Sequence, residues 1–245
     1  MNDIHCHLLP GLDDGPRTAT EALDLARSLV DDGVRHVAAT VHWTPGVFDN
    51  RAAAIRQACT AFAATLAFEN IPLTLQPVTE TRLHPEALEL VARGEIVALG
   101  THKGWKHLLL ELPDAGVPPG ALTAVNALLQ QGWRPIIVHP ERNKGIMADP
   151  ERLRPFVEAG CLVQITAASV IGEFGSAALA CSRALLDHNW VDAVASDAHN
   201  LRGRPPRMTA ARELLSLLVD DDYATLLTES NPARYMGLAL LQPVA

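Results

Sequence analysis

The chain has 245 residues and a formal net charge of −8, and 48% of its residues are apolar, 20% charged and 4% aromatic. This composition fits a soluble α/β protein whose core is built from small aliphatic side chains. The negative charge argues against nucleic-acid binding, which needs an excess of Lys and Arg. The sequence has no signal-peptide pattern and no apolar run near the ~20 residues that cross a bilayer, so we expect a cytoplasmic protein without membrane insertion.

Short runs of β-branched or Leu residues alternate with helical patterns along the whole chain. We expect strands at residues 2–7, 34–40, 73–78, 107–112, 135–139, 161–165 and 190–196. The pattern predicts helices at residues 20–32, 51–69, 85–93, 119–131, 150–159, 177–189, 206–219 and 223–229, and a short last helix with Asn231 as its N-cap and Pro232 as its first residue. Thr18 and Glu21 have the spacing of a capping box, and Gly33 is expected to end that helix. Repeated βα units without a linker predict a parallel sheet in a single α/β domain over residues 1–245.

Residues with metal-binding side chains occur at or just after the ends of the predicted strands. His5 and His7 lie two apart on the first strand, so both point to one face while Cys6 points away. Asp197 and His199 repeat this spacing at the last strand. The strands between them contribute His42, Glu80, Glu111 and His139. In a parallel barrel these strand ends meet at one face, and burying so many polar groups there requires compensating charge, which divalent cations supply.

The predicted ligands combine imidazole nitrogen with carboxylate oxygen and include no thiolate. This donor set favours manganese, iron, zinc or cobalt over calcium or a structural zinc site. More than four ligands indicate more than one ion. Glu80 is suited to bridge two ions about 3.5 to 4 Å apart. Segments 8–17 and 200–206 directly follow predicted strands and are long enough to form active-site loops.

These residues resemble the polymerase-and-histidinol-phosphatase (PHP) superfamily, and within it the bacterial capsular-polysaccharide tyrosine phosphatases that act on tyrosine autokinases. The similarity runs nearly end to end. It is carried by Asp3-Ile4-His5-Cys6-His7, Leu12-Asp13-Asp14-Gly15-Pro16, His42, Glu80, Leu110-Glu111, His139-Pro140-Glu141-Arg142-Asn143, Gln164-Ile165-Thr166, Ala195-Ser196-Asp197-Ala198-His199-Asn200 and Arg204-Pro205-Pro206. The resemblance implies a distorted (β/α)7 barrel of the PHP type, in agreement with the seven predicted strands.

The resemblance also implies a role for each candidate residue. Two or three divalent ions are expected, with manganese favoured and iron, zinc or cobalt as alternatives. The implied ligands are His5, His7, Glu80 and Asp197 for the first ion, Glu80, Glu111 and His139 for the second, and His42 and His199, with Asp14 nearby, for the third. Arg142 and Arg204 are the implied phosphate contacts and the expected catalytic residues.

The chain departs from the commoner family pattern in two places. Trp43 follows His42 where many relatives have a second histidine, and we expect it to add an aromatic wall to the substrate mouth. Val78 and Thr79 precede Glu80 where a Gly-Ala pair is usual, and we expect them to crowd that carboxylate. Neither departure removes an implied ligand.

The function implied by the resemblance is hydrolysis of phosphotyrosine through a metal-bound hydroxide. The implied substrate is a phosphoprotein, the tail of a bacterial tyrosine kinase of capsule or exopolysaccharide synthesis. A cysteine-dependent tyrosine phosphatase is excluded, because it needs an arginine six positions after its cysteine. The residues six positions after the four cysteines are Leu12, Thr65, Ala167 and Asp187. We expect Cys6 to be a small core residue.

Three other interpretations of the sequence remain. A small-molecule phosphatase of the same superfamily, such as one acting on histidinol phosphate, shares the metal cage, although segments 13–16 and 204–206 favour the tyrosine phosphatase branch. A metal-dependent amidohydrolase also begins with HxH, but commonly places a modified lysine between its metals, where this chain offers Glu80 and Glu111. The third is a metal-loaded protein without activity that docks onto a kinase tail. The complete ligand set and the two arginines argue against it, because docking alone does not require polarising metal ions.

Overall fold

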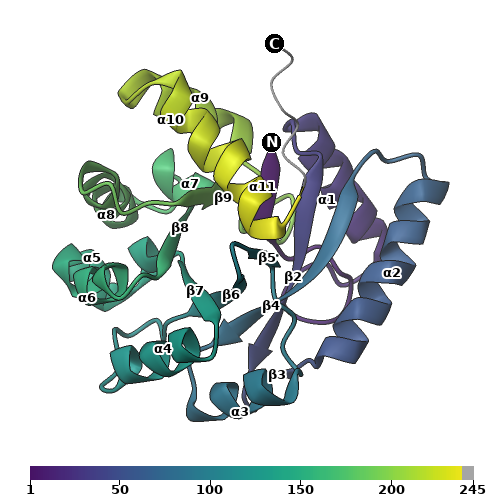
Figure 1. The fold of residues 1–245 in the computed structure, drawn as a ribbon. Coiled ribbons are helices and arrows are strands. Elements are labelled where there is room, and N and C mark those ends of the chain that lie inside the picture. The colour runs from purple at the N-terminus through teal and green to yellow at the C-terminus, as the bar shows by residue number, and fades with distance from the viewer. Residues whose placement is uncertain (239–245) are drawn as a thin grey trace.

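Seven parallel strands curve around a common axis, and helices cover the outside of the ring (Figure 1). The computed structural model describes residues 1–238, so the end of the predicted domain, residues 239–245, lies outside it. The strands pair in the order β1 (Asn2–Cys6), β2 (His36–Thr44), β4 (Thr74–Arg82), β6 (Trp105–Glu111), β7 (Trp133–Val138), β8 (Leu162–Thr166) and β9 (Ala193–Ala195). Two short strands, β3 (Phe48–Asp49) and β5 (Gly100–His102), pair antiparallel with β2 and β6.

The first and last strands meet and nearly close the barrel. Cys6 forms a parallel bridge with Ala198, the His7 N–H donates to the Ala198 carbonyl at 2.9 Å, and the Asp197 N–H donates to the His5 carbonyl at 2.7 Å. The predicted distorted (β/α)7 barrel is therefore confirmed, with all seven strands near their predicted positions. Cys6 is fully buried in the core, also as predicted.

Helices follow the strands in turn. They are α1 (Ala19–Asp31), α2 (Ala52–Phe68), α3 (Pro85–Arg93), α4 (Ala121–Gln130), α5 (Lys144–Ala148), α6 (Arg154–Glu158), α7 (Ala167–Val170), α8 (Ser176–Asp187), α9 (Met208–Leu218), α10 (Asp221–Thr225) and α11 (Asn231–Met236). The capping box of α1 is present, because Thr18 Oγ1 accepts from the Glu21 N–H at 3.2 Å and Glu21 Oε2 accepts from the Thr18 N–H at 3.3 Å. Gly33 follows the helix with φ +82°, as expected of its C-terminal stop.

Two predicted helices differ in detail. The predicted helix 150–159 is a 3-10 turn at Pro150–Leu153 followed by the short α6, because each of the two prolines, Pro150 and Pro155, sits in the first turn of its own helix. The predicted helix 223–229 does not stop before the last helix. It continues through a π turn, Leu226–Ser230, into α11, so that Asn231 is helical and is not the predicted N-cap.

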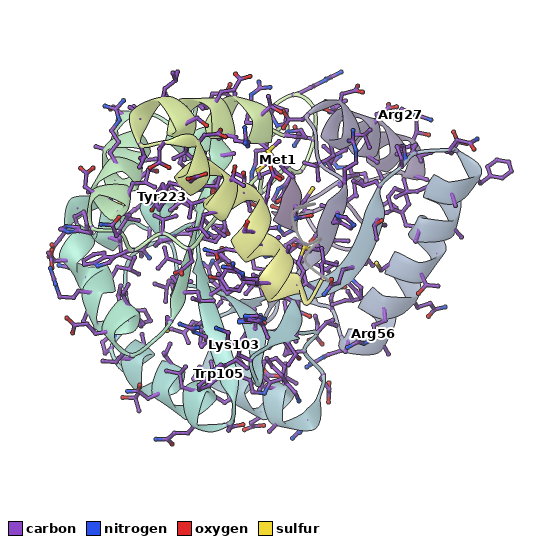
Figure 2. The ribbon with its side chains drawn as sticks, turned by 45° about the horizontal axis from the view of Figure 1, so that its top comes forward. Met1, Arg27, Arg56, Lys103, Trp105 and Tyr223 are labelled. Carbon is purple, nitrogen blue, oxygen red and sulfur yellow. The ribbon has the colours of Figure 1, made fainter. Side chains whose placement is uncertain are left out.

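The N-terminal end of the barrel is closed by α11. Tyr235 and Met236 join an inner cluster with Ile4, Val78 and other aliphatic side chains of the strands. The helix packs against β5 (Figure 2, where Lys103 and Trp105 mark the turn after that strand). Among residues 1–238, none of the helices has the length and apolar character needed to span a membrane.

The structure shows where the two departures from the family pattern lie, Trp43 and the Val78-Thr79 pair. Trp43 is fully buried in the outer core, and its Nε1–H donates to Asp49 Oδ1 at 3.3 Å, so the predicted aromatic wall from Trp43 is wrong. The side chain points away from the barrel mouth because it is adjacent in β2 to His42, which points toward it. Val78 lies in the inner cluster beneath Glu80, and Thr79 faces the other side, where its Oγ1 accepts from the Val97 N–H at 3.0 Å.

Candidate metal centre and active site

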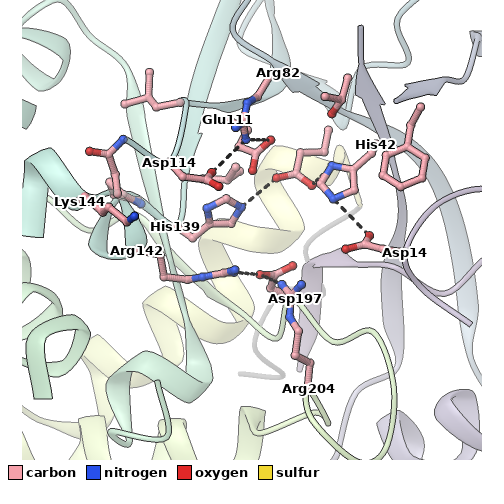
Figure 3. Close-up of a pocket in the computed structure, with 17 residues that line it drawn as sticks. Asp14, His42, Arg82, Glu111, Asp114, His139, Arg142, Lys144, Asp197 and Arg204 are labelled. Atoms are coloured by element: carbon pink, nitrogen blue, oxygen red, sulfur yellow. Dashed lines mark hydrogen bonds and ion pairs between the residues drawn. The ribbon is translucent and has the colours of Figure 1, made fainter. Parts of the chain in front are cut away.

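All nine predicted ligands lie near or after the C-terminal ends of the barrel strands. Figure 3 labels Asp14, His42, Glu111, His139 and Asp197 among them. Strand register accounts for several of their contacts. His42 of β2 is the direct neighbour of Glu80 on β4, and Arg82 of β4 is the direct neighbour of Glu111 on β6. His139, Asp197 and His199 follow β7 and β9, and Asp14 reaches the site from the loop after β1.

Three donor atoms group together at the first predicted site, and a fourth residue, Asp197, lies beside them. His5 Nε2 and His7 Nε2 are 3.2 Å apart and lie 3.2 and 3.1 Å from Glu80 Oε2. Asp197 Oδ1 lies 3.4 Å from His5 Nε2 and 3.7 Å from His7 Nε2. Donors held about 2.1 Å from a tetrahedral ion stand about 3.4 Å from one another. His5, His7 and Glu80 therefore offer donors at a spacing suited to one divalent cation, and Asp197 lies next to them.

Glu80 also contacts the ligands predicted for the other two ions. Its Oε1 lies 2.9 Å from His139 Nε2, and its Oε2 lies 3.1 Å from His42 Nδ1. That buried nitrogen of His42 makes no hydrogen bond among the described residues, as expected of an atom meant for a cation. His42, Glu80 and Glu111 each offer a donor atom within 4.8 Å of the others. Glu80 thus stands at the centre of the cluster, where a bridging carboxylate belongs.

A further set of donors lies beside the Asp14 loop. Asp14 Oδ1 is 3.4 Å from His42 Nε2 and 3.2 Å from His199 Nε2. His7 joins these three, since all four offer a donor atom within 4.8 Å of one another. His7 therefore lies between the two sets of donors, although its Nδ1 contacts Asp13 and its Nε2 is 3.1 Å from Glu80 of the first set.

Two residues orient the histidines of the first site. Asp13 Oδ2 lies 2.8 Å from His7 Nδ1 and also accepts from the His42 N–H at 3.0 Å. Gln164 Oε1 lies 3.0 Å from His5 Nδ1. When Nδ1 donates to such a partner, Nε2 keeps its lone pair and faces the ion. No role was predicted for Asp13 from the sequence, although the pair of adjacent carboxylates, Asp13 and Asp14, in the loop after the HxH strand was the available signal.

The carboxylates of the cluster favour positive charge at the site. Burial disfavours protonation of the two rings, but Glu80, together with Asp197 at His5, outweighs it and raises the pKa of His5 to about 9 and that of His42 to about 10. Burial also opposes ionisation of Asp197, yet His5 and Arg204 hold its pKa well below the usual range. Positive charge is thus favoured beside Glu80 and Asp197, the same charge that a divalent ion would bring.

Both predicted phosphate arginines meet at Asp197. Arg142 Nη1 and Arg204 Nη2 donate to its Oδ2 (Figure 3). Its Oδ1 lies 3.4 Å from His5 Nε2. The Arg142 guanidinium also lies over the Phe174 ring, 5.0 Å from the centroid, and Arg204 Nη1 lies 2.9 Å from His199 Nε2. The Asp197 carboxylate thus connects the candidate metal site to the two arginine side chains that line the cavity.

A cavity of about 430 Å³ opens above this cluster. Its wall includes Glu80, Glu111, His139, Arg142 and Arg204. Arg82, which the sequence analysis did not single out, pairs with Glu111 at 2.8 Å and lines the same cavity. Its position was available from strand alternation, because Arg82 is two residues from Glu80 and points to the same face.

The backbone adopts a left-handed conformation at two of the predicted ligands. His139 has φ +36° and Asp197 has φ +50°, a region that non-glycine residues seldom occupy. Glu141 braces the segment after His139, since its buried Oε1 accepts from the Thr166 N–H at 2.9 Å and from Ser169 Oγ at 2.8 Å. Such backbone conformations are sustained where surrounding contacts hold them in place, and they concentrate at functional sites.

Comparison with known proteins agrees with the resemblance drawn from the motifs. The chain is 36% identical over 230 residues to tyrosine-protein phosphatase YwqE of Bacillus subtilis, which covers 94% of this chain and 89% of the relative. It is 27% identical over 239 residues to tyrosine-protein phosphatase CpsB of Streptococcus pneumoniae, covering 96% of this chain and 97% of the relative.

Solved structures agree as well. A crystal structure from a study of YwqE and CpsB, described there as metal-dependent tyrosine phosphatases, superimposes with a TM-score of 0.91 at 35% identity and covers 99% of this chain and 98% of its own. The phosphotriesterase homology protein of Escherichia coli, at 13% identity and a TM-score of 0.61, shares the fold alone.

The family profile described as "Capsular polysaccharide synthesis, CpsB/CapC" matches residues 1–237. The names of the relatives confirm the predicted enzyme class, a phosphoric monoester hydrolase. The chain belongs to the CpsB/CapC family of capsular polysaccharide synthesis.

Proposed function

We propose that residues 1–245 form one metallophosphatase domain that hydrolyses phosphotyrosine in a protein substrate. The observation that carries the proposal is the shared carboxylate Asp197, which places two arginines directly beside a cluster of imidazole and carboxylate donors. A phosphate monoester needs both an activated nucleophile and compensation for its negative charge. The donor cluster is suited to activating the nucleophile, and the two arginines are suited to compensating the negative charge of the phosphate.

The proposed metal ligands are the nine residues of the cluster, His5, His7, Asp14, His42, Glu80, Glu111, His139, Asp197 and His199. Two or three divalent ions held there would supply an acidified water as nucleophile and positive charge for the phosphoryl oxygens. Manganese suits the mixed nitrogen and oxygen donors, as do iron, zinc and cobalt.

The proposed catalytic residues of the chain itself are Arg142 and Arg204. Each donates one N–H to Asp197, and Arg204 Nη1 also lies 2.9 Å from His199 Nε2. Both side chains line the cavity, where a planar guanidinium binds phosphoryl oxygens. Because Asp197 and Phe174 already hold Arg142, little reorganisation is needed when the substrate arrives. The phenolate of phosphotyrosine, with an unperturbed pKa near ~10, leaves with less protonation than an alkoxide.

We further propose that the physiological substrate is the phosphorylated tail of a bacterial tyrosine autokinase of capsule or exopolysaccharide synthesis, and that the protein works in the cytoplasm. The support is the family description and the names of the relatives. A tail that enters an open cavity needs no opening of the barrel.

Phosphate release from a phosphotyrosine peptide tests the proposal. We expect purified protein to release phosphate with added manganese, to stop after chelation, and to resume when manganese returns. His139→Ala should be inactive, because it removes a contact of Glu80, whereas His188→Ala, which changes an exposed histidine paired with Glu151, should keep full activity.

The same assay on other substrates separates the alternatives. Rapid hydrolysis of histidinol phosphate with none of the phosphopeptide would replace the protein substrate with a small molecule. Hydrolysis of amides or lactones in preference to any phosphomonoester would support the amidohydrolase interpretation. Metal-loaded protein that is inactive on every ester would leave only a docking role.

A further inference from the structure

The short strand β3 presents one aromatic ring to the mouth of the candidate site. Phe48 is paired with Thr44 of β2, and the next residue, Asp49, is paired with Trp43. The buried Trp43 anchors this hairpin through its hydrogen bond to Asp49, and Asn50 donates to the His42 carbonyl at 3.0 Å. The position of Phe48 relative to the metal cluster is therefore set by the sheet and by a buried side chain.

The Phe48 ring lies nearly parallel to the His42 ring. The ring centroids are 5.7 Å apart and the planes are 10° from parallel. The side chain is only partly buried and lines the 430 Å³ cavity. Apart from histidines, no other aromatic side chain in residues 1–238 lines that cavity.

The cavity has an aromatic side and a cationic side. Figure 3 shows His42 on the right, with Arg142 and Lys144 on the left. Phe48 stacks on His42, so it shares the side opposite those two cations. A phosphorylated group that reaches the arginines therefore shares one cavity with the Phe48 ring.

We infer that Phe48 is the specificity-determining residue for an aryl phosphate, and that the phenyl ring of phosphotyrosine packs against it. This inference rests on the proposed function. Packing of two aromatic rings removes apolar surface from water and adds a favourable edge or offset contact. An alkyl phosphate, such as phosphoserine, has no ring to place there and a shorter reach from its main chain. The aromatic wall that the sequence analysis assigned to Trp43 is thus supplied by Phe48, with Trp43 as its anchor.

Inhibitor binding tests this inference without depending on the leaving group. Benzylphosphonate carries the ring of phosphotyrosine, and methylphosphonate carries only the anion. For manganese-loaded protein we expect Phe48→Ala to raise the inhibition constant of benzylphosphonate about tenfold and to leave that of methylphosphonate unchanged. Phe48→Tyr should restore tight binding of benzylphosphonate, and Phe48→Leu should fall between alanine and the wild type. The KM for a phosphotyrosine peptide should rise with the benzylphosphonate constant.

The neighbouring residue provides the matched control. Val47→Ala alters the same hairpin at a residue that is 67% exposed and outside the cavity lining, so both inhibition constants should stay at the wild-type values. Metal content, measured by elemental analysis, should be the same in all variants. Equal weakening of both phosphonates by Phe48→Ala, or a loss of metal, would overturn the inference and assign Phe48 to shielding His42.

Failure of the proposed function would look different. Wild-type protein would then hydrolyse other phosphomonoesters but not the phosphotyrosine peptide. If the peptide is hydrolysed and Phe48→Ala binds both phosphonates as the wild type does, only the inference about Phe48 is wrong.

Discussion

Individual side chains at the barrel mouth depend on partners that are not themselves candidate ligands. Asp13 holds one ring nitrogen of His7 and the backbone N–H of His42, so one carboxylate orients two predicted ligands. Asp197 divides its two oxygens between His5 and the two arginines. Substitution of Asp13 should therefore change metal affinity, and substitution of an arginine bound to Asp197 should change phosphate binding, although both lie at the barrel mouth.

We expect Asp13→Asn to weaken manganese binding by about 10- to 100-fold, because the neutral amide no longer fixes the His7 ring with its Nε2 toward the ion. Competition with a fluorescent chelator measures the affinity. Asp24→Asn, which changes an exposed carboxylate paired with Arg27, is the control and should bind manganese as the wild type does. Equal affinity in the Asp13 variant would show that His7 needs no such partner.

Arg142→Lys should lower kcat/KM for a phosphotyrosine peptide by about 100-fold while the bound metal is retained. Lysine keeps the charge but loses the planar fork and the stacking on Phe174. Steady-state kinetics together with elemental analysis check both parts. Arg202→Lys changes an exposed arginine outside the cavity lining and should be silent. A similar loss in both variants would mean that net charge alone matters.

A residue at the end of one helix caps another helix that is far away in the sequence. The N-terminus of α9 has no cap from its own preceding residue, Arg207. Asp32, at the end of α1, supplies the cap instead: its carboxylate accepts from the Met208 N–H at 2.6 Å and the Thr209 N–H at 3.2 Å. This contact joins the first and last βα units beside the barrel closure.

Asp32→Ala should lower the free energy of unfolding by about 1 to 2 kcal/mol, since it removes the acceptor for two helical N–H groups. Urea denaturation of the metal-free protein measures the change. Asp31→Ala is a matched control, because this adjacent carboxylate is exposed and caps no helix. If both variants lose the same stability, the effect belongs to α1 rather than to the cap of α9.

At the scale of the whole molecule, the two ends of the barrel have opposite chemistry. The C-terminal mouth gathers charged ligands, whereas the N-terminal end is closed by α11 and an apolar inner cluster. Asp192 is an exception at the closed end. Its Oδ2 accepts from the Val163 N–H at 2.9 Å and its Oδ1 accepts from the Tyr235 hydroxyl at 3.3 Å, so it ties β8 to α11.

Burial raises the pKa of Asp192 from 3.8 to about 6, so the folded state favours its protonated form. That contribution to stability is complete below about pH 3.8 and is lost as the pH rises through about 6. Asp192→Asn cannot ionise. The stability of the wild type relative to this variant should therefore fall by about 2 kcal/mol between pH 4 and pH 7.5. Urea unfolding of both metal-free proteins across this range measures the difference, and parallel pH profiles would contradict the expectation.

Much of the fold and of the candidate site could be predicted from local patterns. The seven strands follow from short apolar runs between helical periods, and the capping box at Thr18 follows from spacing alone. The predicted ligands His5 and His7 share a face because strand side chains alternate. The helix at 150–159 was misjudged, because two prolines each begin a new turn.

The residue types at the ends of the strands can be read from the sequence, and in a parallel barrel this is enough to bring the nine predicted ligands to one mouth. Their supporting contacts appear only in three dimensions: Asp13 orients His7, Asp197 holds both arginines, and Phe48 lines the cavity. Alternation and periodicity act within one element, whereas these contacts depend on strand register, loop path and barrel closure, which join residues far apart in the chain.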